Sequence, residues 1–240
     1  MTFRMTLEGI YTPLVTPTRE DGSFDLDTLA ELIERLIGKG VHGLISGGST
    51  GENYAQTVEE RLELARFTVE RTGGRLPVIV GTGAMRTPDS IALAQGAREM
   101  GADAILLGTP PYSVPTEREN ALNALAIDRA ADLPIILYNY PGRMGVAMGE
   151  EFLDRVSRSR NVIGIKESSG DINRVHLLAR DYPHIQISAG WTTRRWNSSP
   201  GARAAGSARG PTSCPRSTSS FTRPACRRAT SPPAAGSCRR

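Results

Sequence analysis

Cysteine and lysine are scarce in this sequence of 240 residues, and long apolar runs are absent. The three cysteines all lie in residues 191–240, so they indicate no disulfide framework, zinc site or cysteine nucleophile for the rest of the chain. No apolar run approaches the ~20 residues of a membrane span, and Met1–Ile10 lacks the apolar core of a signal peptide. We therefore expect a cytoplasmic protein that does not bind membranes.

Residues 191–240 differ in composition from everything before them. They contain ten arginines but no Asp, Glu, Lys, Ile, Leu, Val or Met. Removing these ten from the 29 basic residues leaves 19 against 25 acidic residues, so residues 1–190 carry a net charge of about −6. A segment with so few large apolar side chains cannot repay the entropy of ordering it. We expect residues 191–240 to be disordered, and residues 1–190 to form the folded domain of the chain.

Two explanations could account for the composition of residues 191–240. An arginine-rich arm could bind nucleic acid, since arginine neutralises phosphate. A slip of the reading frame accounts better for the composition. If the frame moves back by one base after Gly190, Trp191 followed by Thr192 must give Asp, and Trp196 followed by Asn197 must give Glu. The sequence thus favours a frame-shifted tail, and we expect no nucleic-acid partner.

Short apolar runs alternate with amphipathic segments throughout residues 1–190. This alternation is typical of right-handed β-α-β units and a parallel sheet. The predicted strands are Ile10–Val15, Val41–Ile45, Pro77–Val80, Ala104–Leu107, Pro134–Tyr138, Val162–Ile165 and Ile185–Ile187. The predicted helices are Asp27–Ile37, Val58–Thr72, Pro88–Met100, Glu117–Ala130, Gly149–Val156 and Ile172–Ala179.

Polar motifs at the strand ends favour an α/β fold of the (β/α)8 barrel (TIM barrel) class over a doubly wound sheet. A doubly wound dinucleotide-binding fold would place a G-x-G-x-x-G turn after its first strand, and residues 10–18 contain none. Gly81 and Gly83 lack the third glycine of such a motif. Barrels instead carry functional residues at the carboxyl ends of several strands. Such motifs follow the second, fourth, fifth and sixth predicted strands at residues 47–52, 109–112, 138–141 and 166–171.

Only two lysines occur in the chain, and one of them indicates chemistry. Lys39 lies beside Gly40 at a predicted helix end, where a cation complements the helix dipole. Lys166 directly follows the apolar run Val162–Ile165. Burial there would lower its pKa, and a neutral amine is the form that attacks a carbonyl carbon. The alternative is a lysine that reaches solvent or pairs with Glu167. In a chain that otherwise uses arginine, an amine favours chemistry.

Two further strand ends carry groups suited to the same chemistry. Tyr138 ends the strand adjacent to that of Lys166, where a phenol could transfer protons. Ser49, Thr50 and Gly51 offer hydroxyls and backbone N–H groups suited to a carboxylate. An ordinary half-buried tyrosine and a simple tight turn remain the alternatives.

Five ordered motifs over residues 7–190 resemble the dihydrodipicolinate synthase and N-acetylneuraminate lyase family. The resemblance implies that Lys166 forms a Schiff base with a 2-oxo acid such as pyruvate and that no cofactor or metal is needed. Tyr138 would be the proton relay, completed by Ser49. Thr50, with Gly48, would hold the keto acid's carboxylate. The motifs are Gly47–Glu52, Gly81–Gly83, Thr109–Tyr112, Tyr138–Arg143 and Gly164–Glu167.

The resemblance also implies a homo-oligomer, dimer or tetramer. Tyr112 matches a tyrosine that reaches into the neighbouring subunit's site, and Arg143 matches an arginine that receives the second substrate in true synthases. Arg143 favours a 4-hydroxy-tetrahydrodipicolinate synthase, which condenses pyruvate with aspartate semialdehyde. Ser49 instead resembles catabolic relatives that act on 2-keto-3-deoxy sugar acids. The resemblance also implies that the positions of the feedback site in regulated members are occupied here by residues unsuited to binding an amino acid: Val58, Arg61, Met85 and Pro111.

An inactive remnant is the alternative from a different class. As written, the chain offers no apolar run for an eighth strand and no final helices. A barrel without its last strand leaves two exposed sheet edges, which favour aggregation. We therefore expect about seven β/α units, with the last strand and the C-terminal helices missing.

Overall fold

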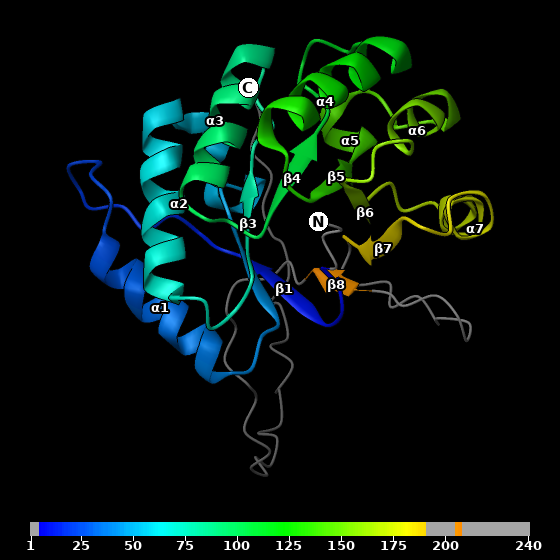
Figure 1. The fold of residues 1–240 in the computed structure, drawn as a ribbon. Coiled ribbons are helices and arrows are strands. Elements are labelled where there is room, and N and C mark those ends of the chain that lie inside the picture. The colour runs from blue at the N-terminus through cyan, green and yellow to red at the C-terminus, as the bar shows by residue number, and fades with distance from the viewer. Residues whose placement is uncertain (1–4, 191–204, 208–240) are drawn as a thin grey trace, which may run out of the picture. The chain divides into compact units, whose positions relative to one another are not determined.

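The computed structural model describes residues 5–190 and 205–207 of the chain. Eight parallel strands pair in sequence order and close into a ring, in which β8 lies beside β1 (Figure 1). The seven strands predicted from the sequence are confirmed. The strands are β1 (Ile10–Pro13), β2 (Gly43–Ser46), β3 (Val78–Gly81), β4 (Ala104–Gly108), β5 (Ile135–Asn139), β6 (Val162–Glu167), β7 (Gln186–Ala189) and β8 (Ala205–Ser207).

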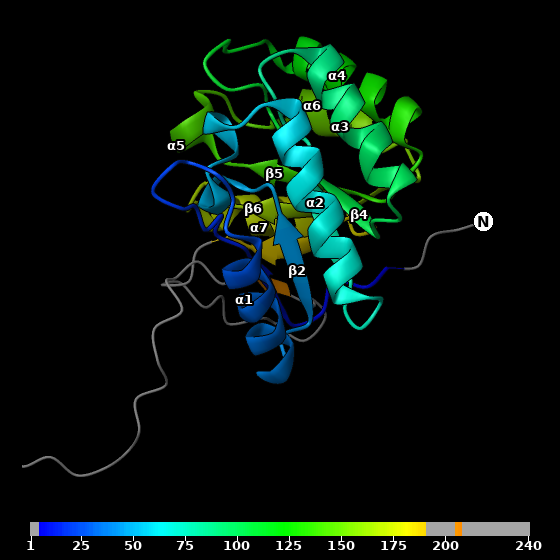
Figure 2. The same cartoon turned by 90° about the vertical axis from the view of Figure 1, so that its left-hand side faces the viewer.

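Helices alternate with the strands and lie outside the ring, with α1 to α4 side by side in Figure 2. All six predicted helices are confirmed, and none of the described helices is long and apolar enough to cross a membrane. The additional α5 and the two 3-10 turns are too short to show a helical period in the sequence. The elements are α1 (Leu26–Gly38), η1 (Ser49–Gly51), η2 (Asn53–Ala55), α2 (Val58–Thr72), α3 (Thr87–Glu99), α4 (Glu117–Ala131), α5 (Pro141–Met144), α6 (Glu150–Val156) and α7 (Ile172–Asp181).

The eighth strand corrects one expectation. We predicted that the last strand is missing, yet Ala205–Ser207 pairs with both β7 and β1. Three residues are enough to form this strand, because without it the edges of β1 and β7 would both have unpaired backbone groups. Backbone pairing does not require the apolar run that is typical of the other strands. In the described part of the chain no helix lies between β7 and β8 or after β8. The barrel class is confirmed, and its last units are incomplete within the residues that the structure describes. The predicted disorder of the remaining tail falls outside those residues.

The barrel has two apolar layers because most of its strands are buried on both faces. One layer fills the ring itself and includes Ile45, Ile79, Leu106 and Tyr138. The larger layer lies between strands and helices and includes Phe152. Side chains alternate between these layers along each strand. Residues two apart at a strand end therefore point into the ring together.

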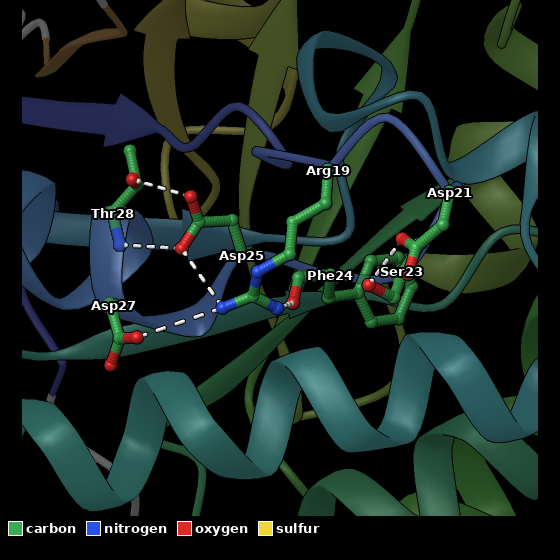
Figure 3. A network of polar contacts seen from close by, with 7 residues as sticks. All are labelled: Arg19, Asp21, Ser23, Phe24, Asp25, Asp27 and Thr28. Atoms are coloured by element: carbon green, nitrogen blue, oxygen red, sulfur yellow. Dashed lines mark hydrogen bonds and ion pairs between the residues drawn. The ribbon is translucent and has the colours of Figure 1, made fainter.

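The segment between β1 and α1 is stabilised by a network of hydrogen bonds and ion pairs (Figure 3). The Asp25 side chain caps α1 by accepting hydrogen bonds from the Thr28 backbone N–H at 3.1 Å and its hydroxyl at 2.8 Å. Arg19 donates to the Phe24 carbonyl oxygen at 2.6 Å and lies 3.5 Å from Asp25. These contacts stabilise the start of α1 and so help to position this helix after β1.

Candidate functional site

A cavity of about 460 Å³ opens at the carboxyl ends of the strands. Its walls include the last residues of β1, β3 and β4, which are Pro13, Gly81 and Gly108. This is the end of the ring where β/α barrels place their active sites. Six of the seven predicted site residues line the cavity together: Gly48, Ser49, Thr50, Tyr138, Arg143 and Lys166.

Lys166 lies at the inner end of this cavity and is only 5% exposed. It is paired in register with Tyr138 on the neighbouring strand β5. The Lys166 Nζ atom lies 4.6 Å from the centroid of the Tyr138 ring. A lysine that merely reaches solvent is therefore the wrong interpretation. The amine and the phenol predicted to react together share one surface inside the ring.

Glu167 points to the other face of β6, where other groups bind its carboxylate. Asn139 Nδ2 donates to both carboxylate oxygens, at 3.0 and 2.8 Å, and the Ser169 backbone N–H donates at 2.8 Å. The Arg174 guanidinium from α7 lies 3.6 Å away as an ion pair. Asn139 and Arg174 were not predicted as functional residues from the sequence. Their role depends on which strands are neighbours, which no local pattern shows.

The turn that carries Ser49 and Thr50 is held from two sides. Gly51 O accepts hydrogen bonds from Thr16 Oγ1 at 2.7 Å and Gln56 Nε2 at 2.8 Å. On the other side, a Cβ atom added to Gly81 would collide with the Gly47 carbonyl group, so these two backbones touch directly. Gly47 has φ +67°, a conformation that favours glycine. The glycines predicted as motif residues thus place two hydroxyls at the cavity wall.

Arg143 reaches the cavity from the short helix α5 and is exposed. Its guanidinium carbon lies 5.5 Å from the centroid of the Tyr140 ring, and that ring lies 5.9 Å from the Tyr138 ring. Tyr140 was missed as a functional candidate. Its spacing of two from Tyr138 was the available signal, because residues i and i+2 of a strand share a face.

The sequence of residues 6–198 matches the dihydrodipicolinate synthetase family. The chain belongs to this family. A curated relative, the 4-hydroxy-tetrahydrodipicolinate synthase of Cellvibrio japonicus, is 40% identical over 177 residues, which are 74% of this chain and 61% of that protein. The chain therefore spans about three fifths of the length of the curated relatives it matches.

Solved structures of the family have the same fold. The chloride-inhibited dihydrodipicolinate synthase of Acinetobacter baumannii, determined with pyruvate, is 35% identical with a TM-score of 0.74 and covers 77% of this chain and 64% of its own. A sialic acid aldolase of Ruminococcus gnavus, described as a catalytic lysine mutant, is 27% identical with a TM-score of 0.74 and covers 77% of this chain and 61% of its own. A synthase and an aldolase are thus both represented among the structural neighbours of this family member.

Tyr112 is the predicted site residue that the fold does not bring into the cavity of this family member. It is 89% exposed and has φ +69°, which is unusual for a residue other than glycine. Val114, two residues later, is also exposed with φ +44°. The loop after β4 therefore presents an aromatic ring outward, and the role of Tyr112 across a subunit boundary stays a prediction.

The cavity is also lined by the four residues that the resemblance assigned to a feedback site: Val58, Arg61, Met85 and Pro111. Arg61 is 5% exposed and donates hydrogen bonds to the Gly83 carbonyl oxygen at 3.1 Å and the Gly81 carbonyl oxygen at 2.8 Å. Desolvation lowers the pKa of its guanidinium to about 10, so it stays a cation at neutral pH. The Arg61 guanidinium therefore stabilises the backbone at the end of β3, and Gly47 packs against that backbone at Gly81.

Proposed function

We propose that this chain is a lyase that forms an imine between Lys166 and pyruvate or a related 2-oxo acid. The observation that carries the proposal is the position of Lys166, buried at the inner end of a cavity with its amine over the Tyr138 ring. A buried amine beside a phenol, in a cavity that two hydroxyls also line, has the groups that carbonyl addition needs. Family membership and the pyruvate-bound structure of the Acinetobacter relative support the same chemistry.

The proposed steps of imine formation use residues that line this cavity. The neutral Lys166 amine adds to the C2 carbonyl of the keto acid, and the carbinolamine then loses one water to give the imine. Tyr138 and Ser49 transfer the protons that the carbonyl oxygen gains and the nitrogen loses. Thr50, with the backbone N–H groups that begin at Gly48, binds the carboxylate of the keto acid. Transfer of a proton from C3 to the imine nitrogen gives an enamine, and its C3 atom then attacks the carbonyl carbon of an aldehyde.

For the second substrate we propose aspartate semialdehyde, as in a 4-hydroxy-tetrahydrodipicolinate synthase. Arg143 at the cavity wall supplies a guanidinium that suits the aldehyde's carboxylate. The relatives at about 40% identity carry that name. The second candidate is a lyase or dehydratase for 2-keto-3-deoxy sugar acids, which Ser49 favours. An inactive remnant is the third, because the last units of the barrel are incomplete in the described part of the chain.

A homo-oligomer is part of the proposal. The strongly exposed Tyr112 ring, in a left-handed backbone conformation, suits an aromatic contact with a second copy of the chain. We propose that it completes the proton relay in that copy's cavity.

Borohydride trapping tests the covalent step with an internal control. Reduction in the presence of pyruvate should add a pyruvate-derived mass to the peptide that contains Lys166. The peptide containing Lys39, the other lysine of the chain, should remain unmodified. Lys166→Arg should abolish the adduct, because a guanidinium keeps the charge but does not act as an amine nucleophile. An adduct that persists in Lys166→Arg, or no adduct in the parent chain, contradicts the proposal and favours the remnant.

Turnover assays separate the two catalytic branches. With pyruvate present, consumption of aspartate semialdehyde should be saturable. Arg143→Ala should raise the KM for the aldehyde much more than that for pyruvate, by about tenfold or more, since a charge-assisted pair contributes a few kcal/mol. Turnover of a 2-keto-3-deoxy sugar acid without consumption of the semialdehyde would assign the chain to the catabolic branch.

A further inference from the structure

Four side chains form a row from the inside of the cavity to its mouth. The Lys166 amine lies over the Tyr138 ring, the Tyr138 ring contacts the Tyr140 ring at 5.9 Å with a tilt of 42°, and the Arg143 guanidinium lies over Tyr140. Tyr140 is the one member that does not line the cavity. Any effect it has on a bound substrate must therefore pass through a neighbour.

The position of Arg143 depends on few other contacts. It is exposed, and among residues 5–190 no carboxylate lies within ion-pair distance of its guanidinium. An arginine in that setting has many rotamers, and ordering it for a ligand costs free energy. A ring held at a fixed place below the guanidinium reduces that cost, because cations are attracted to aromatic faces.

The backbone around Tyr140 keeps the two groups together. The Tyr140 carbonyl oxygen accepts hydrogen bonds from the backbone N–H groups of Arg143 and Met144, both at 3.0 Å. The helix α5 then ends at Gly145, which has φ +75°. Because Arg143 follows Tyr140 by three residues, this single helical turn brings its guanidinium next to the aromatic ring of Tyr140. Tyr140 is itself half-buried, and it packs against the aromatic and aliphatic side chains that fill the inside of the barrel.

We infer that Tyr140 is a positioning residue that fixes the Arg143 guanidinium at the cavity mouth and so selects an aldehyde substrate that carries a carboxylate. The inference rests on the proposed function, and it concerns the selection of the second substrate rather than the imine. The inference predicts that the KM for the aldehyde and the rate of imine formation with pyruvate respond differently to substitution of Tyr140. Loss of the Tyr140 ring weakens binding of the anionic aldehyde, whereas the reaction of Lys166 with pyruvate is unchanged.

Tyr140→Leu, compared with Tyr140→Phe, tests the inference. Tyr140→Leu removes the aromatic face and should raise the KM for aspartate semialdehyde by about two- to fivefold, the range expected for an exposed cation–aromatic contact. Tyr140→Phe keeps the face and should leave that KM within about twofold of the parent value. The kcat and the rate of borohydride trapping with pyruvate should be the same in all three proteins.

A double-mutant cycle shows whether Tyr140 acts through Arg143. In the Arg143→Ala background, Tyr140→Leu should cause no further rise in the KM for aspartate semialdehyde. An equal rise in both backgrounds overturns the inference, as does a trapping rate that falls in parallel with the rise in KM. So does a parent chain that forms the pyruvate adduct but does not consume aspartate semialdehyde. A parent chain without the adduct refutes the proposed function itself.

Discussion

Asn139 and Glu167 are paired in register on β5 and β6, and their side chains are joined by two hydrogen bonds of 3.0 and 2.8 Å. Both are buried on the face of the sheet opposite the cavity. The residues just before them, Tyr138 and Lys166, form the next register pair and point into the cavity. A slip by one residue between these strands would turn one of those two side chains away from the site. The hydrogen bonds between Asn139 and Glu167 therefore stabilise the register that places Tyr138 and Lys166 in the cavity.

Asn139→Ala should reduce both stability and reactivity. It leaves the buried Glu167 carboxylate without the two hydrogen bonds from the Asn139 side chain, so the free energy of unfolding should fall by about 2–3 kcal/mol. Borohydride trapping at Lys166 should slow by roughly tenfold, because small displacements of reacting groups have large effects on rate. Denaturant unfolding and adduct mass spectrometry measure the two effects.

Asn161→Ala is the matched control for that experiment. Asn161 is also buried and donates to a carboxylate, Asp128 Oδ1, at 2.9 Å, but it lies before β6 at the other end of the strand. It should lose a similar amount of stability and keep the parent trapping rate. Equal slowing of trapping in both variants would show that Asn139 has only a general structural role.

The seven long strands and six helices could be predicted because buried parallel strands are continuous apolar runs between amphipathic segments. The strand β8 could not, since it pairs through backbone groups and has no such run. Lys166 was identifiable from its rarity and its place after Ile165. Asn139 and Tyr140 were not identified. Their partners come from a neighbouring strand and from the turn after β5, and such contacts follow from register rather than from local sequence.

Gly81→Ala tests the backbone contact that supports the substrate turn. The new methyl group would collide with the carbonyl group of Gly47, and backbone atoms can yield only by moving the turn that carries Ser49. Stability should fall by about 1–3 kcal/mol. The pyruvate concentration for half-maximal trapping should rise by roughly tenfold, in line with the effect of misplacing a site by about 1 Å or less.

Gly38→Ala is the control for the glycine substitution. Gly38 is the last residue of α1, and in the described part of the chain no atom lies within 4 Å of an added Cβ. Alanine there should be neutral or should raise stability by up to about 1 kcal/mol, with unchanged trapping. If Gly81→Ala behaves in the same way, close packing between β2 and β3 does not support the site.

We propose that the reading frame changes after Gly190, on the basis of the composition of residues 191–240. Resequencing the gene across that codon tests this directly. In a frame moved back by one base, the restored residues should include the Asp and Glu that the codons force, and similarity to the synthases should extend beyond residue 198, where the family match now ends. Confirmation of the printed frame would show that the arginine-rich segment belongs to the protein.

Ser49 and Thr50 are adjacent on the same turn, and the proposed mechanism gives them different roles. Both line the cavity at the start of η1. If Thr50 binds the carboxylate of pyruvate, Thr50→Val should raise the pyruvate concentration for half-maximal trapping by about tenfold, since a hydrogen bond to a charged group contributes about 1.5–3 kcal/mol. The maximal trapping rate should change little.

Ser49→Ala should show the opposite pattern. A hydroxyl that relays protons affects the rate rather than the affinity, so the maximal rate of imine formation should fall by about 10²-fold, the lower end of the range for general acid–base groups. The half-saturating pyruvate concentration should stay near the parent value. Each variant serves as the control for the other, because both remove one hydroxyl from the same turn. If both variants change affinity alone, Ser49 belongs to the carboxylate site, and Tyr138 transfers its protons without it.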